Sequence, residues 1–270
     1  NEQYGMNKGV LRGYLTWIKS ALTGNWGESW AWNMSVTAKF RDVIWYSFAL
    51  SLVSMFFQII IAIPLGVKAA RKQYSFTDYF TTVVSMVCIS MPTFFLATLL
   101  KYVFSIKLGW FDLTGMQGRD YLYLSEFGRF LDMAKHFVLP AVTLTVISIG
   151  SLMRYTRTNM LEVLSADYIR TARAKGVPEN KVISRHAFRN TLIPLITVLG
   201  GSLPSLFSGA LITETLFGIR GIGYTSYNSM IQADIPFVMF YLAFISILTL
   251  LGNLLSDLLY AAVDPRVRLS

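Results

Sequence analysis

The sequence predicts an all-α membrane protein, a polytopic bundle of spanning helices, and three observations lead to this fold class. Of the 270 residues, 54% are of hydrophobic types and only 14% are charged, whereas soluble domains average about 25% charged residues. Five runs without Asp, Glu, Lys or Arg are close to the roughly 20 residues that a spanning helix needs. None of them alternates as the strands of a membrane barrel do.

The five uncharged runs predict five spanning helices in order along the chain. They contain 25, 22, 17, 23 and 22 residues and cover 43–67, 79–100, 137–153, 191–213 and 235–256. The third run is short, but a helix can continue past Arg154 because an arginine near a helix end can reach the interface. We therefore expect a membrane domain over residues 43–264.

The loops between these runs predict the orientation in the membrane. Thirteen Lys and Arg lie in the 55 residues of one set of loops, 68–78, 154–190 and 264–270. Eleven lie in the 99 residues of the other set, 1–42, 101–136 and 214–234. Because cytoplasmic loops carry the excess of positive charge, the first set is expected inside. Residues 1–42 then form an extracytoplasmic segment, and 265–270 form a cytoplasmic tail.

Two further expectations follow from this orientation. A chain that begins outside, with neither a methionine nor a signal segment, implies a further spanning helix upstream. The net charge of +9 reflects the bias of the loops and gives no reason to expect a nucleic acid partner.

The basic stretch between the third and fourth runs predicts a cytoplasmic elbow of two helices. Ser165 suits an N-cap, Asp167 suits a first helical turn, and Gly176 suits the residue just after a helix, which predicts a helix over 166–175. Pro178 fits the first position of a second helix, which we expect to end near Asn190.

The first helix of this elbow has two distinct faces. Its apolar stripe is expected to comprise Leu161, Leu164, Tyr168 and Ala172, whereas Arg170 and Arg173 share another face. One face could pack on the spanning helices and the other on a partner protein. On charge alone, a loop that lies on lipid headgroups is an equal alternative.

The stretch "ADYIRTARAKGVPENKVISRHAFRNTLIPL" resembles the EAA loop of permease subunits in ABC importers for oligopeptides, dipeptides and nickel. The general consensus of that loop begins with Glu-Ala-Ala, and only Ala172 matches it. The peptide branch instead has Arg-Thr-Ala-Arg-Ala-Lys-Gly followed by Arg-His-Ala-x-Arg-Asn-x-x-Ile-Pro, and both are complete here. Similar stretches cover most of the chain: "GNWGES", "IPLGVKAA", "SMPTFFLATLL", "ETLFGIRGIG" and "DLLYAAVDPRVR".

This resemblance, which is to the B-type permease, implies a coupled transport mechanism. Such permeases have six spanning helices, the first before "GNWGES", and work in the prokaryotic cytoplasmic (inner) membrane with a second permease and an extracytoplasmic solute-binding protein. Two ATPase subunits, which bind ATP and Mg²⁺, dock against the EAA-type loop, here residues 161–190. By position, the coupling residues are Asp167, Tyr168, Arg170, Thr171, Ala172, Arg173, Ala174, Lys175, Gly176 and Val177.

The sequence lacks the motifs of several enzyme classes. It contains no Gly-x-x-x-x-Gly-Lys-Ser/Thr, no His-Glu-x-x-His and no Gly-x-Ser-x-Gly, so we expect a non-catalytic chain without a cofactor or metal of its own. The alternatives are an ion-driven secondary transporter or channel, or the same importer type carrying nickel or another small solute. A secondary transporter would predict paired repeats with broken helices and buried acids.

Polar residues within spans are costly and often line a pathway. On this ground the candidate pathway residues are Gln58, Lys101, Asn253 and Asp257, although Lys101 could reach the interface and Asp257 could form a structural ion pair.

Two external features have two interpretations each. The first is a group of four tryptophans, Trp17, Trp26, Trp30 and Trp32, and the second is Glu214 with "FGIRGIG". Each is either an aromatic or amphipathic segment at the membrane surface or a docking surface for the solute-binding protein.

Overall fold

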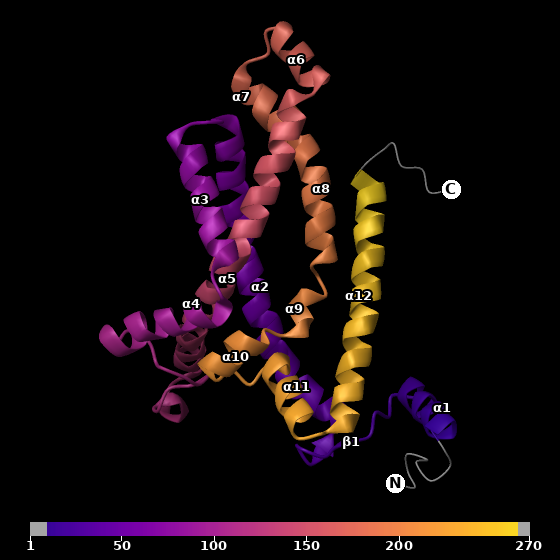
Figure 1. Ribbon diagram of the computed structural model, residues 1–270. Helices are drawn as coiled ribbons and strands as arrows, with labels where there is room; N and C mark the ends of the chain where they lie inside the picture. Colours follow the sequence, from indigo (N-terminus) through magenta and orange to yellow (C-terminus); the bar gives the residue numbers. More distant parts are fainter. Residues whose placement is uncertain (1–9, 264–270) are drawn as a thin grey trace.

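The computed structural model describes residues 10–263 and is almost entirely helical (Figure 1). Within this part, four helical segments are long and apolar enough to cross a membrane: Val36–Arg71, Glu126–Ser165, Glu179–Ser208 and Ile235–Ala262. A bent pair, Phe76–Ser90 with Thr93–Lys107, becomes a fifth span if it is counted as one. The predicted all-α membrane bundle is therefore confirmed. The predicted cytoplasmic tail, 265–270, and the first residues of the external segment lie outside the described residues.

The centre of the bundle is the pair of long helices α2 (Val36–Arg71) and α5 (Glu126–Ser165), which pack along each other. Small residues allow this close approach. Gly66 of α2 lies against Met153 and Thr156 of α5, where a methyl group would overlap both. The hydroxyl of Ser54 donates to the Ala141 carbonyl across the pair at 3.3 Å.

The second uncharged run is not one straight helix. Helix α3 (Phe76–Ser90) ends before Pro92, and α4 (Thr93–Leu100) with the π-helical η2 (Lys101–Lys107) continues at a bend of 100°. Proline has no N–H to donate and disfavours helical geometry in the residue before it; Met91 is accordingly extended, with ψ 121°. The span expected over 79–100 is therefore this bent pair.

The fourth run is also interrupted. Helix α8 (Phe188–Gly201) is followed by the short α9 (Ser205–Ser208), and Gly209 then turns the chain with φ +80° into α10 (Leu211–Phe217). We expected the run to stay helical to residue 213, but the chain leaves the direction of α8 before that point. The turn falls at a glycine because glycine adopts a positive φ readily.

One end of the molecule gathers the short elements (Figure 1). These are α1 (Val10–Leu22), the antiparallel pair β1 (Glu28–Ser29) and β2 (Met34–Ser35), η3 (Tyr121–Tyr123), α10 and α11 (Ile222–Ile231). The buried Asp234 ties β1 to the start of α12 (Ile235–Val263) by accepting hydrogen bonds from Ser29 Oγ and from the Trp30 N–H at 3.0 Å. In the expected orientation this is the extracytoplasmic end.

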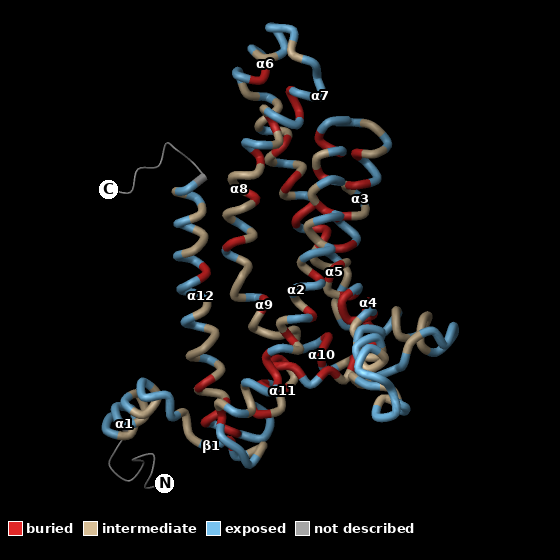
Figure 2. Tube along the Cα trace, turned by 180° about the vertical axis from the view of Figure 1, so that it is seen from behind, coloured by how far each residue is buried: buried red, intermediate tan, exposed pale blue. Residues whose placement is uncertain are grey.

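The opposite end carries the elbow (Figure 1). It comprises α6 (Asp167–Ala174), α7 (Glu179–Lys181) and the π-helical η4 (Val182–Ala187), which runs directly into α8. Burial follows the α2–α5 pair, the base of the elbow and the α10–α11 region, whereas α12 is largely open on its outer side (Figure 2). The two ends of the bundle are thus built from short elements.

Candidate functional site

The first helix of the elbow ends as the sequence predicts. Gly176 has φ +71°, and two hydrogen bonds close the turn: the Gly176 N–H donates to the Arg173 carbonyl at 3.0 Å, and the Val177 N–H donates to the Ala172 carbonyl at 3.2 Å. This pair of bonds is the Schellman motif. The end of α6 is therefore rigidly defined.

The start of this helix differs from the expectation. Ser165 is the last residue of α5, where its hydroxyl donates to the Glu162 carbonyl at 2.7 Å, so it does not cap α6. The N-cap is Ala166, whose methyl side chain cannot make a capping hydrogen bond. The predicted cap at Ser165 is wrong because its hydroxyl bonds backwards, into the helix that precedes it. Pro178, which we expected at the first position of the second helix, is its N-cap, and the helix begins at Glu179. The expected end near Asn190 is also wrong, because η4 continues directly into α8.

One buried side chain anchors α6 to the bundle. Ile169 is 0% exposed and packs with Met160 of α5 and with Val182 and Ala187 of η4. Tyr168, which we expected on the buried stripe, is 48% exposed. The expected stripe assumes one continuous helix from Leu161 to Ala172. The extended backbone at Ala166 interrupts this helix and changes which side chains face the bundle, so Ile169 is buried in place of Tyr168.

The two arms of the elbow are joined by a two-point ion pair. Arg173 Nε lies 3.1 Å from Glu179 Oε2, and Arg173 Nη2 lies 2.8 Å from Glu179 Oε1. These hydrogen bonds raise the pKa of Arg173. Next to Glu179, Asn180 accepts a hydrogen bond from Arg71, at the end of α2, at 2.8 Å. The second arm is therefore bonded both to the first arm and to α2.

The remaining coupling residues form an outer surface. Of the ten, Ala172 and Val177 are half-buried, and the other eight are exposed: Asp167, Tyr168, Arg170, Thr171, Arg173, Ala174, Lys175 and Gly176. Arg170 and Asp167 form the expected pair at 3.5 Å, but it is so exposed that it adds little stability. The elbow is thus a short helix packed on one side and open on the other.

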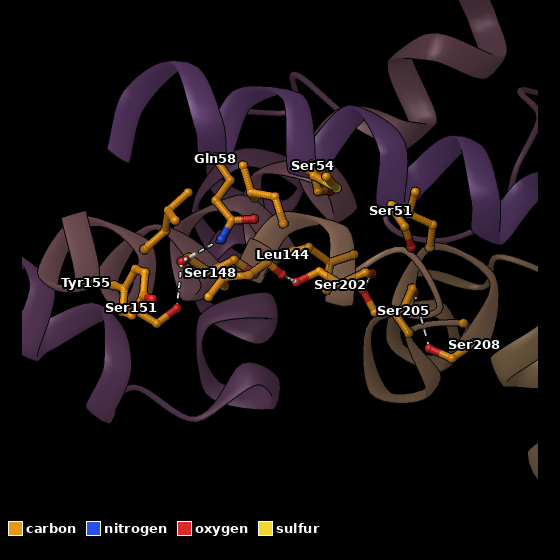
Figure 3. Close-up of a pocket in the computed structure, with 17 residues that line it drawn as sticks. Ser51, Ser54, Gln58, Leu144, Ser148, Ser151, Tyr155, Ser202, Ser205 and Ser208 are labelled. Atoms are coloured by element: carbon orange, nitrogen blue, oxygen red, sulfur yellow. Dashed lines mark hydrogen bonds between the residues drawn. The ribbon is translucent and has the colours of Figure 1, made fainter. Parts of the chain in front are cut away.

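A second site is a groove between α2, α5 and the α8–α9 segment. Its volume is about 500 Å³, and it extends from Tyr155 of α5 to Ser208 of α9 (Figure 3). Seven serines line it: Ser51, Ser54, Ser148, Ser151, Ser202, Ser205 and Ser208. Within residues 10–263, no charged side chain is among those that line it.

The polar groups of the groove are partly engaged with backbone carbonyl groups of the surrounding helices. Gln58 Nε2 donates to the Ser148 carbonyl at 3.0 Å, and Ser151 Oγ donates to the same oxygen at 3.0 Å (Figure 3). Ser202 donates likewise to the Val198 carbonyl at 2.8 Å. A hydroxyl that donates to its own helix keeps oxygen lone pairs free to accept. The lining therefore offers neutral hydrogen-bonding groups rather than charge.

The structure separates the four candidate pathway residues. Gln58 lines the groove. Lys101 lies instead at the start of η2, where its Nζ donates to the Leu216 carbonyl at the end of α10 at 2.5 Å. Asn253 and Asp257 are exposed on α12 and do not line the groove.

The serines are the groove residues that sequence reasoning missed. Their signal was present as spacing, because three-residue intervals place side chains on one helical face. Ser148 and Ser151 have this spacing, and so do Ser202, Ser205 and Ser208.

The external patch around Glu214 is corrected by the structure. Glu214 was expected on the surface with the glycine-rich "FGIRGIG", but it is 0% exposed. The tryptophans are partly packed: Trp26 contacts Trp17 and Phe240, and Trp32 Nε1 donates to Ser229 at 3.1 Å. Their two interpretations remain predictions.

The sequence of this chain is similar to a known protein family and to several known proteins. Residues 62–269 match the family described as binding-protein-dependent transport system inner membrane component. The chain is 38% identical over 267 residues to the oligopeptide transport system permease protein AppB of Bacillus subtilis, covering 98% of this chain and 83% of that protein. It is 36% identical over 277 residues to the di/tripeptide transport system permease protein DppB of Pseudomonas aeruginosa, covering 98% and 82%.

A solved structure has the same fold. A chain of the MetNI methionine ABC transporter, in an inward facing conformation, matches with a TM-score of 0.63 over 84% of this chain and 97% of that chain. At 18% identity, this likeness concerns the arrangement of the helices alone.

Proposed function

This chain belongs to the family of binding-protein-dependent transport system inner membrane components, and from this premise we propose that it carries oligopeptides or dipeptides. It is a non-catalytic permease subunit of an ABC transporter in the inner membrane. The peptide cargo is inferred from the names of its relatives, the oligopeptide and di/tripeptide permeases, and from the chemistry of the groove.

The observation that carries the proposal is the neutral, serine-lined groove. Peptides differ in side-chain charge but share a backbone of N–H and C=O groups. Hydroxyl and amide groups such as those of Ser148, Ser202 and Gln58 can exchange hydrogen bonds with that backbone without selecting a charge. The groove is open along one side, and we propose that a second permease subunit covers it to complete the pathway.

The elbow is the proposed site of coupling to two ATPase subunits. Ile169 holds α6 on the bundle, while the exposed coupling residues face away from it. A helix with fixed ends can transmit a partner's movement as a rigid body. Because α6 follows α5 after a single extended residue, movement of the elbow would reach Ser148 and Ser151 directly. In this proposal, ATP and Mg²⁺ bind to the ATPase subunits, and a solute-binding protein delivers the cargo.

The experiment is uptake of a labelled dipeptide into proteoliposomes that contain this chain, a second permease, the two ATPases and the binding protein. Reversing the charges of Arg170 and Lys175 to glutamate should abolish ATP-dependent uptake and weaken ATPase association. The matched control is Arg119→Glu, an exposed arginine outside the elbow, which should leave both unchanged.

Two results would contradict the proposal. Uptake by this chain without any ATPase would favour the secondary transporter. Full ATP-dependent uptake by the variant with both charges reversed would show that the elbow does not couple ATP hydrolysis to transport. The identity of the cargo is measured separately, by titrating di- and oligopeptides, and Ni²⁺, into the binding protein.

A further inference from the structure

Glu214 is a fully buried acid held by three separate segments of the chain. Its Oε1 accepts hydrogen bonds from Ser47 Oγ at 2.6 Å and from the Ala210 N–H at 2.9 Å. Its Oε2 accepts from the Tyr224 N–H at 2.8 Å. Among the described residues it has no cationic partner within ion-pair distance. Hydrogen bonds to its carboxylate thus join α2, the α9–α10 connection and α11.

The same contacts complete the start of α11. Its N-cap, Gly221, makes no side-chain capping bond, so the free N–H groups of the first turn need acceptors from elsewhere. Ser47 Oγ accepts the Ile222 N–H at 2.7 Å, and Glu214 accepts the Tyr224 N–H. A helix N-terminus favours a carboxylate. The acid is therefore satisfied by the geometry of α11 itself.

The glycines of this region are required by the closeness of the backbone to Glu214. A methyl group on Gly221 would overlap both Ser47 Oγ and the Glu214 carboxylate. A methyl group on Gly209 would overlap the backbone of Gly223. Of the glycine-rich sequence that we considered a surface patch, Gly221 and Gly223 instead pack around one buried acid.

This cluster lies directly behind the end of the groove. Ser208, Gly209 and Ala210 line that end, and the Ala210 N–H is itself bonded to Glu214. Ser51, one helical turn from Ser47 on α2, lines the opposite wall. We propose that Glu214 is a positioning residue that holds the α9–α11 segment against α2 as the external floor of the groove. This inference rests on the proposed function for the orientation of the floor.

The floor can be tested by thiol accessibility in the assembled transporter. The native thiol is removed by Cys88→Ala, and Ser208→Cys provides a reporter at the floor. In intact cells that express all subunits, a membrane-impermeant maleimide outside should leave this thiol unlabelled. Glu214→Gln should raise the labelling rate about tenfold. The amide NH₂ of glutamine would face a backbone N–H, of Ala210 or Tyr224, whose hydrogen bond the carboxylate oxygen accepts. The matched control, Glu126→Gln, changes an exposed acid at the same end and should have no effect.

A second variant covers the case in which Glu214→Gln is not recovered from the membrane. Ser47→Ala removes one donor of Glu214 and the acceptor of Ile222, and it should raise labelling about threefold. The proposal is wrong if recovered Glu214→Gln is labelled at the wild-type rate, or if Ser208→Cys is already labelled from outside when Glu214 is intact. It is also wrong if Ser47→Ala alone is available and does not change the rate.

A reporter at the other end separates this inference from the proposed function. Ser151→Cys should react only with reagent delivered to the cytoplasmic side. If it reacts from outside while Ser208→Cys reacts from inside, the orientation in the proposed function is wrong, and the external floor with it. Protection of both thiols from outside together with unchanged labelling in Glu214→Gln overturns the role of Glu214 alone.

Discussion

Arg157 of α5 binds Asp78 of α3 through both of its carboxylate oxygens, with Arg157 Nε 2.5 Å from Oδ1 and Nη2 2.9 Å from Oδ2. Asp78 is 3% exposed and also accepts the Tyr74 N–H at 3.0 Å. The turn between α2 and α3 is thereby fixed to the helix that leads into the elbow.

Removal of Arg157 should destabilise the protein strongly. Arg157→Leu leaves a buried carboxylate without its partner, which typically costs about 3–5 kcal/mol. The measurement is the thermal unfolding midpoint in detergent. The double variant Asp78→Leu with Arg157→Leu should recover much of the loss, and equal losses in the single and double variants would show that the pair is not coupled.

Ile169→Ala should detach the elbow helix from the bundle. Ile169 is fully buried, and truncation of such a side chain to alanine costs about 2–5 kcal/mol. Because the loss is local, limited proteolysis should cut near α6 and ATP-dependent uptake should fall. Ile106→Ala is the control, since Ile106 is 61% exposed. Resistance of α6 to protease in Ile169→Ala would contradict its role as the anchor.

Glu179→Gln should separate coupling from stability. Arg173 and Glu179 have side chains that are 42% and 49% exposed, so the pair contributes under about 1 kcal/mol. It contributes this between the ordinary pKa values of glutamate and arginine, where Glu179 is ionised and Arg173 is protonated. The hydrogen bonds to Glu179 raise the pKa of Arg173, so the loss comes at acidic pH, when the carboxylate is protonated.

The thermal midpoint of Glu179→Gln should therefore stay within a few degrees of wild type, while peptide uptake per ATP hydrolysed falls. Asp120→Asn, an exposed acid in another loop, serves as the control. A drop in stability as large as that of Ile169→Ala would argue against this division.

Charge at Gln58 should change which peptides pass. Gln58→Glu places an acid in a groove lined without charged side chains, so uptake of acidic dipeptides should fall relative to cationic ones, and Gln58→Arg should reverse the order. Uptake of pairs such as Glu-Glu and Lys-Lys is compared at saturating binding protein. Gln58→Leu, which adds no charge, should keep the wild-type ratio. Identical ratios in all three variants would place Gln58 outside the pathway.

The sequence predicts the features that depend on local chemistry. Gly176 ends α6 because a left-handed residue is needed there, and the long apolar runs become long helices. It predicts less well where backbone direction matters, because absence of charge says nothing of a bend: the turns at Pro92 and Gly209 leave the runs equally apolar. The buried face of α6 is predicted wrongly because one extended residue, Ala166, interrupts the helix before it.

The groove could be predicted only in part. Its serines come from helices far apart in the chain, and only packing brings Ser51, Ser148 and Ser202 together. Gln58 was identified because an amide within an apolar run is conspicuous, whereas serine is too common in spans to attract notice. Lys101 is conspicuous for the same reason as Gln58, but its Nζ donates to the Leu216 carbonyl and it does not line the groove, so polarity within a run does not by itself place a residue in this groove.

The π-helical turn η4 shifts the direction of the side chains between the base of the elbow and α8. It lies between the elbow and α8, and a π turn holds one more residue than the α-helical turn it replaces. Each residue of an α-helix advances the side-chain direction by about 100°. The extra residue therefore acts as an angular spacer. It turns the groove-lining residues of α8, Val198 and Leu199, relative to Val182 and Ala187 of η4, which pack with Ile169 at the base of the elbow. The two faces therefore share one helical axis although they point in different directions.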